Sequence, residues 1–398
     1  MHYIRLLRPA KLDVSDRRKP LISLLVTITT DLGDSFLYPD EPVDLIVAAD
    51  DPTGQSLVLG VDRPPRWSAG MRVLDVKVPV KPHLRREHVT CTVKIHPATQ
   101  PRPLGAMRGT DVLPWSVGLG STAGQGLIMP ATVEMAKGVC APVSLRRLQL
   151  GTGSQLEDLL NIDLEEDIGE SIARHIWDAG VVTAAFLADA CCSRGVLDVL
   201  PIKRKSFGVL ELGSGVGILG ITAARIVEKA ATTQGQTLIE ATVLLTDLPE
   251  AEERARSNIS RAETALSHPD TGDSAVTLQY ESLDWDEGKH GQFGPLASAR
   301  SWDVVVLSDC TYNVDSLPAL VGTLSALHAA NIKHPETSEG SKTSVILATK
   351  PRHSSEQALF GLLEADEWRY RVLKSIPLPK LGDEDEVVDI YLLEKGKG

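Results

Sequence analysis

The strongest chemical signal in the chain is a glycine-rich segment with an acidic residue in front of it. Residues 211–220, ELGSGVGILG, follow the short apolar run at 207–210 and precede a helix-like stretch. A strand that feeds a glycine turn and then a helix is typical of sites that hold a nucleotide-like cofactor. Gly215, Gly217 and Gly220 satisfy the dinucleotide pattern G-x-G-x-x-G. Taken alone, the triplet is equally consistent with a tight strand-to-helix turn.

The acidic residue Glu211 favours one class of cofactor over another. A pyrophosphate at this turn would face an unpaired negative charge in a partly dry crevice, whereas a cationic ligand would be stabilised there. S-adenosylmethionine has an ammonium, a sulfonium and no phosphate, and it needs the close backbone approach that glycine permits. The sequence therefore predicts S-adenosylmethionine as the cofactor. A NAD-linked dehydrogenase is the alternative on motif matching, although the chain shows no obvious hydride-transfer His or Lys.

Acidic and aromatic residues after two further strands extend this site. Asp247 follows the predicted strand 241–246, and in a doubly wound sheet it lies beside the first turn, where a carboxylate can accept both ribose hydroxyls. The alternative for Asp247 is a turn or cap before Pro249. Asp284 and Trp285 follow a third strand, so we place them against the adenine, with core packing as the alternative for the indole.

The residues expected to meet the substrate follow the apolar run VVVL. Residues 308–312, SDCTY, come at the carboxyl end of a central strand, where open α/β sheets place their active crevice. Methyl transfer from a sulfonium requires an in-line nucleophile, so Asp309 and Tyr312 would orient and desolvate it. Because a carboxylate raises the pKa of a lysine amine, we assign Asp309 as an anchor rather than a base. A helix N-cap is its alternative. The same carboxylate would raise the pKa of Cys310, which we discount as a nucleophile.

The elements that must position these residues alternate between helix and strand after residue 151, as in a parallel sheet covered by helices. The predicted helices are 168–191, 216–229, 250–267, 316–330 and 354–365. The predicted strands are 207–212, 241–246, 276–280, 304–308 and 344–349, followed by a terminal hairpin of 369–375 and 387–393.

The first part of the chain has a different character. Residues 1–100 contain alternating or β-branched runs at 21–30, 43–49, 55–61, 71–80 and 88–96, separated by Pro, Gly and Asp, which predicts a small β-rich unit. Residues 101–130 are rich in Gly and Pro and are interpreted as a loop or linker. We therefore divide the chain into a β-rich accessory region, 1–150, and a cofactor-binding domain, 151–398.

Composition restricts the class of protein. With 398 residues, of which 42% are hydrophobic and 24% charged, the chain can bury a large core, and it contains no apolar run long enough for a membrane span and no secretory signal. Five cysteines without a metal-binding spacing predict a reducing compartment and no metal site. Residues 1–150 carry 19 basic and 14 acidic side chains, leaving 22 and 39 for the rest, so the second half carries −17. Such a charge disfavours nucleic acid and attracts lysine-bearing proteins, although a surface tuned for solubility is equally consistent.

Taken together, several motifs resemble one family. HIWDAG, VLELGSGVGILG, LLTDLPE, LDWD, SDCTY and the terminal IPL…VVDIYLLEK are similar to the seven-β-strand protein-lysine methyltransferases of the methyltransferase-16 group, especially its methyltransferase-like 21 branch. The resemblance covers about residues 150–398. It implies an α/β, Rossmann-like sheet of seven mostly parallel strands with an antiparallel C-terminal hairpin. Residues 1–150 have no counterpart in the short animal enzymes of this family.

The resemblance also implies a set of site residues. Asp309 and Tyr312 form the family's D-x-x-Y substrate motif, Trp177 lines the cofactor, and Trp285 flanks the adenine. Including sequence neighbours, the cofactor site assigned to S-adenosylmethionine is Trp177, Glu211, Gly213, Ser214, Gly215, Gly217, Asp247, Leu248, Trp285 and Ser308.

The implied activity is methylation of a lysine on a non-histone protein, such as an AAA ATPase, a chaperone or an elongation factor, in the cytoplasm and also the nucleus. Nucleic acid and membranes are not expected as partners. A methyltransferase of the same fold that acts on a small molecule or nucleic acid, and a non-catalytic binding module, stay open as alternatives.

Overall fold

The structure is a computed structural model, and it describes 15 segments of the chain. The described segments are 1–16, 19–50, 56–59, 63–80, 91–98, 105–115, 127–136, 138–151, 159–169, 172–192, 206–233, 240–266, 276–334, 343–379 and 386–395. The chain forms two compact units. The first consists of Met1–Gln149, Asp163–His175 and Leu378–Asp385, and the second of Leu150–Ile162, Ile176–Pro377 and Glu386–Gly398. The chain thus passes between the units more than once, where the sequence-based division had a single boundary after residue 150.

The first unit is built mainly of strands. They are β1 (His2–Leu6), β2 (Lys11–Asp13), β3 (Leu21–Thr30), β4 (Val43–Asp50), β5 (Ser56–Val58), β6 (Arg66–Trp67), β7 (Leu74–Pro79), β8 (Cys91–Pro97), β9 (Ala106–Arg108), β10 (Ile128–Met129), β11 (Ala131–Ala136), β12 (Val139–Cys140) and β13 (Val143–Leu150), with β14 (Leu160–Asp167) completing the sheet. The long alternating run of β3 lies between β1 and β7, both antiparallel to it. Trp67 is fully buried in the core of this unit, and its indole N–H donates to the Leu37 carbonyl.

The prediction of a linker at 101–130 is wrong for the part of this segment that the structure describes, because that part contains two paired strands. Ala106–Arg108 forms β9, which pairs with β13, and Ile128–Met129 forms β10, which pairs with β1. These strands could not be predicted because each is only two or three residues long, too short for a periodic pattern. Residues 101–104 and 116–126 lie outside the described part of the chain, as do residues 55, 60–61 and 88–90 of two predicted strands.

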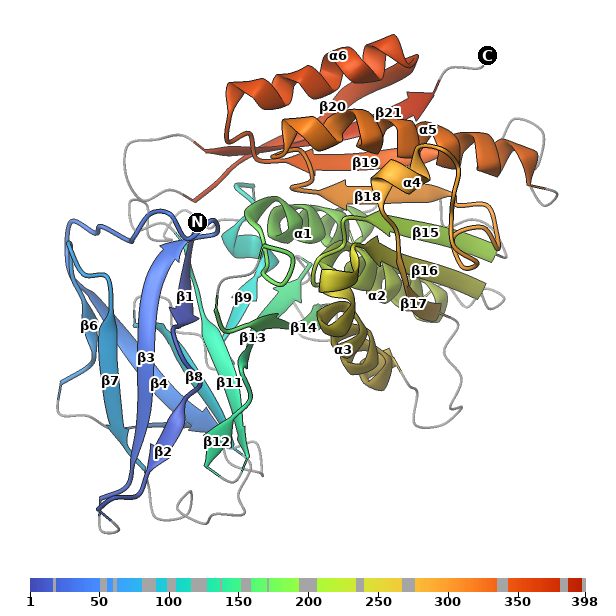
Figure 1. Ribbon diagram of the computed structural model, residues 1–398. Helices are drawn as coiled ribbons and strands as arrows, with labels where there is room; N and C mark the ends of the chain where they lie inside the picture. The colour runs from blue at the N-terminus through green and yellow to red at the C-terminus, as the bar shows by residue number, and fades with distance from the viewer. Residues whose placement is uncertain are drawn as a thin grey trace. The chain divides into compact units, whose positions relative to one another are not determined.

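The second unit contains a seven-stranded sheet covered by helices (Figure 1). Its strands, from one edge to the other, are β17 (Val276–Ser282), β16 (Glu240–Asp247), β15 (Ser206–Leu212), β18 (Val304–Ser308), β19 (Ser344–Thr349), β21 (Val387–Lys395) and β20 (Trp368–Pro377). The pairs from β17 to β19 are parallel, while β21 is antiparallel to both β19 and β20. The predicted α/β class is therefore what the structure shows, and the carboxyl ends of five strands share one edge.

Helices cover both faces of this sheet. The helices are α1 (Asp178–Cys192), α2 (Ile218–Thr233), α3 (Pro249–Leu266), α4 (Trp285–Gly288), α5 (Leu317–Lys333) and α6 (Ala358–Ala365). The first three pack beside one another on one face, and the last three on the other (Figure 1). The central strand β18 has the apolar sequence VVVLS because both of its faces are buried. Its bounds are those predicted from this continuous apolar run. Among the described residues, no helix has the length and apolarity needed to cross a membrane.

Two predicted helices differ from the structure. The helix expected at 168–191 begins only at Asp178, because Gly169 has a φ of 133° and the amide of Asp167 pairs with the Arg174 carbonyl in a turn. The helix expected at 354–365 is divided into a 3-10 turn, Ser354–Gln357, and α6. Because α1 begins later, its amino end, rather than its side, lies next to the segment that follows β18.

Candidate functional site

The glycine turn connects β15 to α2 in a backbone conformation that other residues rarely adopt. Gly213, Gly215 and Gly217 all have positive φ angles, of 61°, 52° and 86°. A Cβ atom on Gly213 would lie 2.5 Å from the Cys310 Sγ, and one on Gly217 would clash with the Leu245 side chain. Cys310 and Leu245 therefore pack tightly against the turn. Since its glycines carry no side chains, a ligand can approach the backbone closely.

Glu211 does not have the unpaired charge that the sequence suggested. Its side chain is only 2% exposed, and its carboxylate accepts the amides of Leu219 at 3.2 Å and Gly220 at 2.8 Å. These amides belong to the first turn of α2, so Glu211 ties the helix start back to the end of β15. Burial raises the pKa of Glu211 to about 8, and the nearby charge of Asp247 adds to this effect, although the two amides oppose it.

The raised pKa of Glu211 leads to a testable pH dependence. A bound cation near Glu211 favours the carboxylate, so below about pH 8 its binding must release a proton. We expect the ratio of affinities for S-adenosylmethionine and S-adenosylhomocysteine, which differ by a methyl group and one positive charge, to rise roughly tenfold between about pH 6 and pH 8 and then level off. Calorimetry across this range measures the ratio. Glu211→Gln should flatten the curve, and a slope that persists in this variant would contradict the assignment to Glu211.

Asp247 ends β16 directly beside this turn, as the strand order predicts. Its Oδ2 accepts the Gly215 amide at 2.7 Å, and its Oδ1 accepts the Leu248 amide at 2.7 Å. Burial raises the pKa of Asp247, although these two amides favour the carboxylate. The residue is still partly exposed, and Leu248 beside it is 45% exposed. Each carboxylate oxygen can accept more than one hydrogen bond, so Asp247 can support the turn and also receive ribose hydroxyls.

Trp285 and Asp284 have different roles in the structure. Trp285 is half-buried at the start of α4, and its ring edge would lie 3.3 Å from a Cβ on Gly213, so the indole lies against the glycine turn. Asp284 caps α4, because its side chain accepts the Asp286 amide at 2.8 Å. The capping role of Asp284 was missed by the sequence reading, which considered only contact with the adenine.

The segment after β18 contains a strained backbone at Asp309. This residue has a φ of 53°, uncommon for a side chain other than glycine, and such strain persists only where surrounding contacts maintain it. Its carboxylate accepts the Ala179 amide at 2.9 Å, at the amino end of α1. Ser308 lies beneath the same helix start, with its hydroxyl 3.3 Å from where a Cβ on Gly180 would be. Tyr312 is 56% exposed, so its ring is available to a substrate.

The buried thiol of Cys310 packs against the glycine turn. Its Sγ lies 3.5 Å from the Leu212 carbonyl oxygen, next to the glycine turn. Burial raises the pKa of Cys310 far above its ordinary value, and the charges of Asp247, Asp309 and Glu211 raise it further. This thiol is unsuited to act as a nucleophile, as the sequence suggested. Since Asp309 directly precedes this thiol, the end of β18 lies against the glycine turn.

A buried hydroxyl in the turn fits a ligand of the predicted kind. Ser214 is 4% exposed, and its Oγ has no hydrogen-bond partner within the described residues. A buried hydroxyl without a partner is costly, so its presence at a turn points to a ligand that supplies one. Together with the carboxylate of Asp247 and the indole of Trp285, this hydroxyl fits the polar and aromatic parts of S-adenosylmethionine.

Sequence reasoning missed the residues after β19. Lys350 is buried and pairs with Asp178 at 2.8 Å and with Glu386 at 2.9 Å. Arg352 pairs with Asp309, and its guanidinium carbon lies 5.3 Å from the centre of the Trp177 ring. Trp177 is thereby located beside Asp309. The signal in the sequence was KPR directly after the apolar strand SVILAT, at the sheet edge that carries the other site residues.

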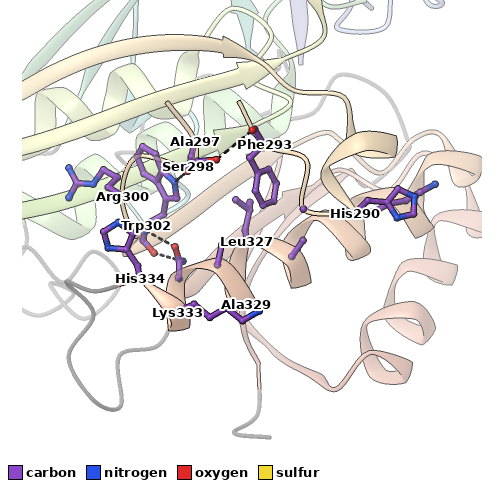
Figure 2. A pocket seen from close by; sticks show the side chains of 15 residues that line it. His290, Phe293, Ala297, Ser298, Arg300, Trp302, Leu327, Ala329, Lys333 and His334 are labelled. Atoms are coloured by element: carbon purple, nitrogen blue, oxygen red, sulfur yellow. Dashed lines mark hydrogen bonds between the residues drawn. The ribbon is translucent and has the colours of Figure 1, made fainter. Parts of the chain in front are cut away.

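A separate cavity of about 480 Å³ lies away from these residues (Figure 2). It is located between the segment 289–300 and the second half of α5, with Trp302 and Leu327 in its lining. Trp302 precedes the amino end of β18, whereas the candidate site is at the carboxyl end of the same strand. None of the predicted site residues lines this cavity.

Comparisons with known proteins point to one family for the second half of the chain. A family model described as lysine methyltransferase matches residues 156–366. A UPF0665 family protein of Schizosaccharomyces pombe is 31% identical over 196 residues, which cover 49% of this chain and 48% of that protein. The protein N-lysine methyltransferase METTL21A of Danio rerio is 29% identical over 160 residues, which cover 40% of this chain and 57% of that protein. The matches thus span only about half of the length of these relatives.

Solved structures are similar to this chain only at a low level. A SAM-dependent methyltransferase of Methanosarcina mazei has 12% identity and a TM-score of 0.30, covering 50% of this chain and 96% of that one. The TYW2 protein of Pyrococcus horikoshii, in complex with MeSAdo, has 11% identity and a TM-score of 0.31, covering 63% and 78%.

Proposed function

The chain belongs to the lysine methyltransferase family, and from this premise we propose that it is a protein-lysine N-methyltransferase that modifies a non-histone protein. It is a methyltransferase, and S-adenosylmethionine is its methyl donor. We propose that the sheet of the second unit is the Rossmann-like methyltransferase sheet of this family, that residues 151–398 form the methyltransferase domain, and that residues 1–150 form an accessory region. We also propose that the enzyme acts in the cytoplasm and the nucleus.

The observation that carries this proposal is the placement of three acidic residues at the glycine turn. Asp247 accepts the Gly215 amide at 2.7 Å and Glu211 accepts the Gly220 amide at 2.8 Å, while Asp309 directly precedes Cys310, whose Sγ packs against Gly213. Both reactants of lysine methylation arrive as cations: the donor has a sulfonium and an ammonium, and the lysine is protonated in water. A region with three carboxylates stabilises such ligands and disfavours phosphate groups. The Ser214 hydroxyl without a partner is consistent with the same ligand.

The residues of this chain would act mainly by orientation. When bound, S-adenosylmethionine supplies an activated methyl group on its sulfonium. The glycine turn and Trp285 hold the donor, and Asp247 receives its ribose. Asp309 anchors the lysine amine, while the exposed Tyr312 lies two residues beyond the buried Cys310 and contacts the substrate. Alignment of the amine with the methyl group, in a site from which water is excluded, is the main catalytic requirement.

A NAD-linked dehydrogenase is a poorer fit because of Glu211. Dinucleotide folds bind the pyrophosphate at the amino end of the helix after the glycine turn. Here the amides of Leu219 and Gly220 in the first turn of α2 already donate to the Glu211 carboxylate. A phosphate would have to displace the buried Glu211 carboxyl group from these donors.

A nucleic-acid substrate is also disfavoured. Enzymes that methylate the adenine amino group are expected to carry N/D-P-P-Y where this chain has DCTY. A net charge of −17 on residues 151–398 would also repel a phosphate backbone. A protein partner with a target lysine, of the AAA ATPase, chaperone or elongation factor type, is therefore the proposed substrate class.

The proposal is tested by incubating the purified full-length chain with methyl-labelled S-adenosylmethionine and a cell lysate. We expect label on a protein band that survives nuclease and is removed by protease. A reaction without the enzyme gives the background. Label found only on nucleic acid or on small molecules would contradict a protein substrate, and absence of any enzyme-dependent label would contradict the activity.

A further inference from the structure

Three groups from two other segments of the chain meet at Asp309. Its carboxylate accepts the Ala179 amide at 2.9 Å and a guanidinium N–H of Arg352 at 3.4 Å. The guanidinium carbon of Arg352 lies 5.3 Å from the centre of the Trp177 ring. The side chains of Asp309 and Arg352 are 7% and 19% exposed, so this ion pair is mostly shielded from water. An arginine placed between an indole and a carboxylate has the geometry of a cation bound in an aromatic and acidic pocket.

The backbone of Arg352 is fixed independently of its side chain. The Glu356 carboxylate accepts the amides of Arg352 at 2.8 Å and His353 at 3.0 Å through its Oε1. Its Oε2 accepts the hydroxyl of Thr311 at 2.7 Å, two residues after Asp309. The Glu356 carboxylate thereby links the loop after β19 to the segment after β18. Because these hydrogen bonds use the backbone of Arg352, a substitution of its side chain leaves them intact.

We propose that Arg352 is a positioning residue of the methyl-transfer site that partly neutralises Asp309 and keeps its carboxylate at the amino end of α1 beside Trp177. The inference rests on the proposed function, in that S-adenosylmethionine and a lysine are the cations concerned. Arg352 lies outside the D-x-x-Y motif, since it follows β19 whereas the motif follows β18.

The physical need for such a cation follows from the chemistry of the amine. An isolated carboxylate at Asp309 would hold the lysine as an ammonium, which has no lone pair to attack the methyl group. A guanidinium that is always charged reduces this attraction without removing the carboxylate as a hydrogen-bond acceptor. The pair therefore lets Asp309 orient an amine while weakening its preference for the protonated form.

The test is a double-mutant cycle on the affinities of the full-length chain for S-adenosylmethionine and S-adenosylhomocysteine, measured by calorimetry at one pH. The two ligands differ by one methyl group and one positive charge, so their affinity ratio reports the local charge. We expect Arg352→Gln to raise the ratio about tenfold, because Asp309 is no longer neutralised. Asp309→Asn should lower it by a similar factor, because the Arg352 charge is then unopposed. The double variant should return to within about threefold of wild type.

Controls separate this effect from general loosening of the fold. Arg371→Gln on the exposed β20 removes an equivalent charge away from the site and should leave the ratio unchanged. Arg352→Lys retains the charge and should stay near wild type. The inference is overturned if Arg352→Gln or Asp309→Asn leaves the ratio within about twofold, or if both shift it in the same direction. If Arg352→Gln does not fold, Arg352→Met decides in its place, since it keeps a long side chain and removes only the charged head, and it should raise the ratio by a similar factor. A wild-type chain that binds neither ligand overturns the proposed function itself, and the inference with it.

Discussion

Asp247→Ala is expected to weaken the binding of S-adenosylhomocysteine on the order of 100-fold. The Asp247 carboxylate accepts the amides of Gly215 and Leu248 and would also accept the ribose hydroxyls, so its removal loses both a ligand contact and the support of the glycine turn. Hydrogen bonds to a charged group contribute about 1.5–3 kcal/mol each, and the expected loss corresponds to about 3 kcal/mol. Calorimetry with the purified chain measures this change.

Two further variants separate the ligand contact at Asp247 from loss of structure. Asp247→Asn keeps one acceptor oxygen and nearly the same shape, so a loss nearer tenfold is expected. Glu263→Ala removes an exposed carboxylate near the other end of α3 and should not affect binding. An affinity of Asp247→Ala within threefold of wild type would show that the ribose lies elsewhere.

Asp309→Asn is expected to reduce the rate of methyl transfer at saturating donor and substrate on the order of 100-fold, while the affinity for S-adenosylhomocysteine changes less than about threefold. Asparagine tolerates the positive φ of this position and is the same size, so the backbone strain is retained and only the charge is removed. The amine would then lack its anchor. Radiolabel transfer to the protein found in the lysate measures the rate.

The exposed aspartate Asp315, six residues further along the chain, provides the matched control. Asp315→Asn removes a charge outside the strained turn and should leave the rate near that of wild type. Equal loss of donor binding and transfer in Asp309→Asn would indicate that Asp309 belongs to the cofactor site. A rate within tenfold of wild type would remove Asp309 from the proposed catalytic arrangement.

The features that the sequence predicted well depend on local patterns. The continuous apolar run of β18 predicted a strand buried on both faces, and its bounds agree with the structure. The glycine spacing predicted the turn after β15, and the alternation of helices and strands predicted a parallel sheet covered by helices. Membership of the lysine methyltransferase family is confirmed by the family model. The individual cofactor and substrate contacts stay predictions.

The features that the sequence could not predict depend on contacts between distant residues. The partners of Glu211 are backbone amides on the next helix, and no pattern of residue types shows that a carboxylate folds back onto them. Arg352 meets Asp309 across 43 positions because β18 and β19 are neighbours, which is known only once the strand order is known. Helix α1 begins ten residues later than expected because the turn containing Gly169 overrides the apolar periodicity.

Tandem mass spectrometry of the protein labelled in the lysate reaction tests the central claim most directly, since it locates the transferred methyl group on a single atom. The account predicts methyl groups on the side-chain nitrogen of a lysine, present with the wild-type chain and reduced on the order of 100-fold with Asp309→Asn. Methyl groups found on arginine, glutamine or a carboxylate, or the same lysine modified equally by both chains, would contradict it.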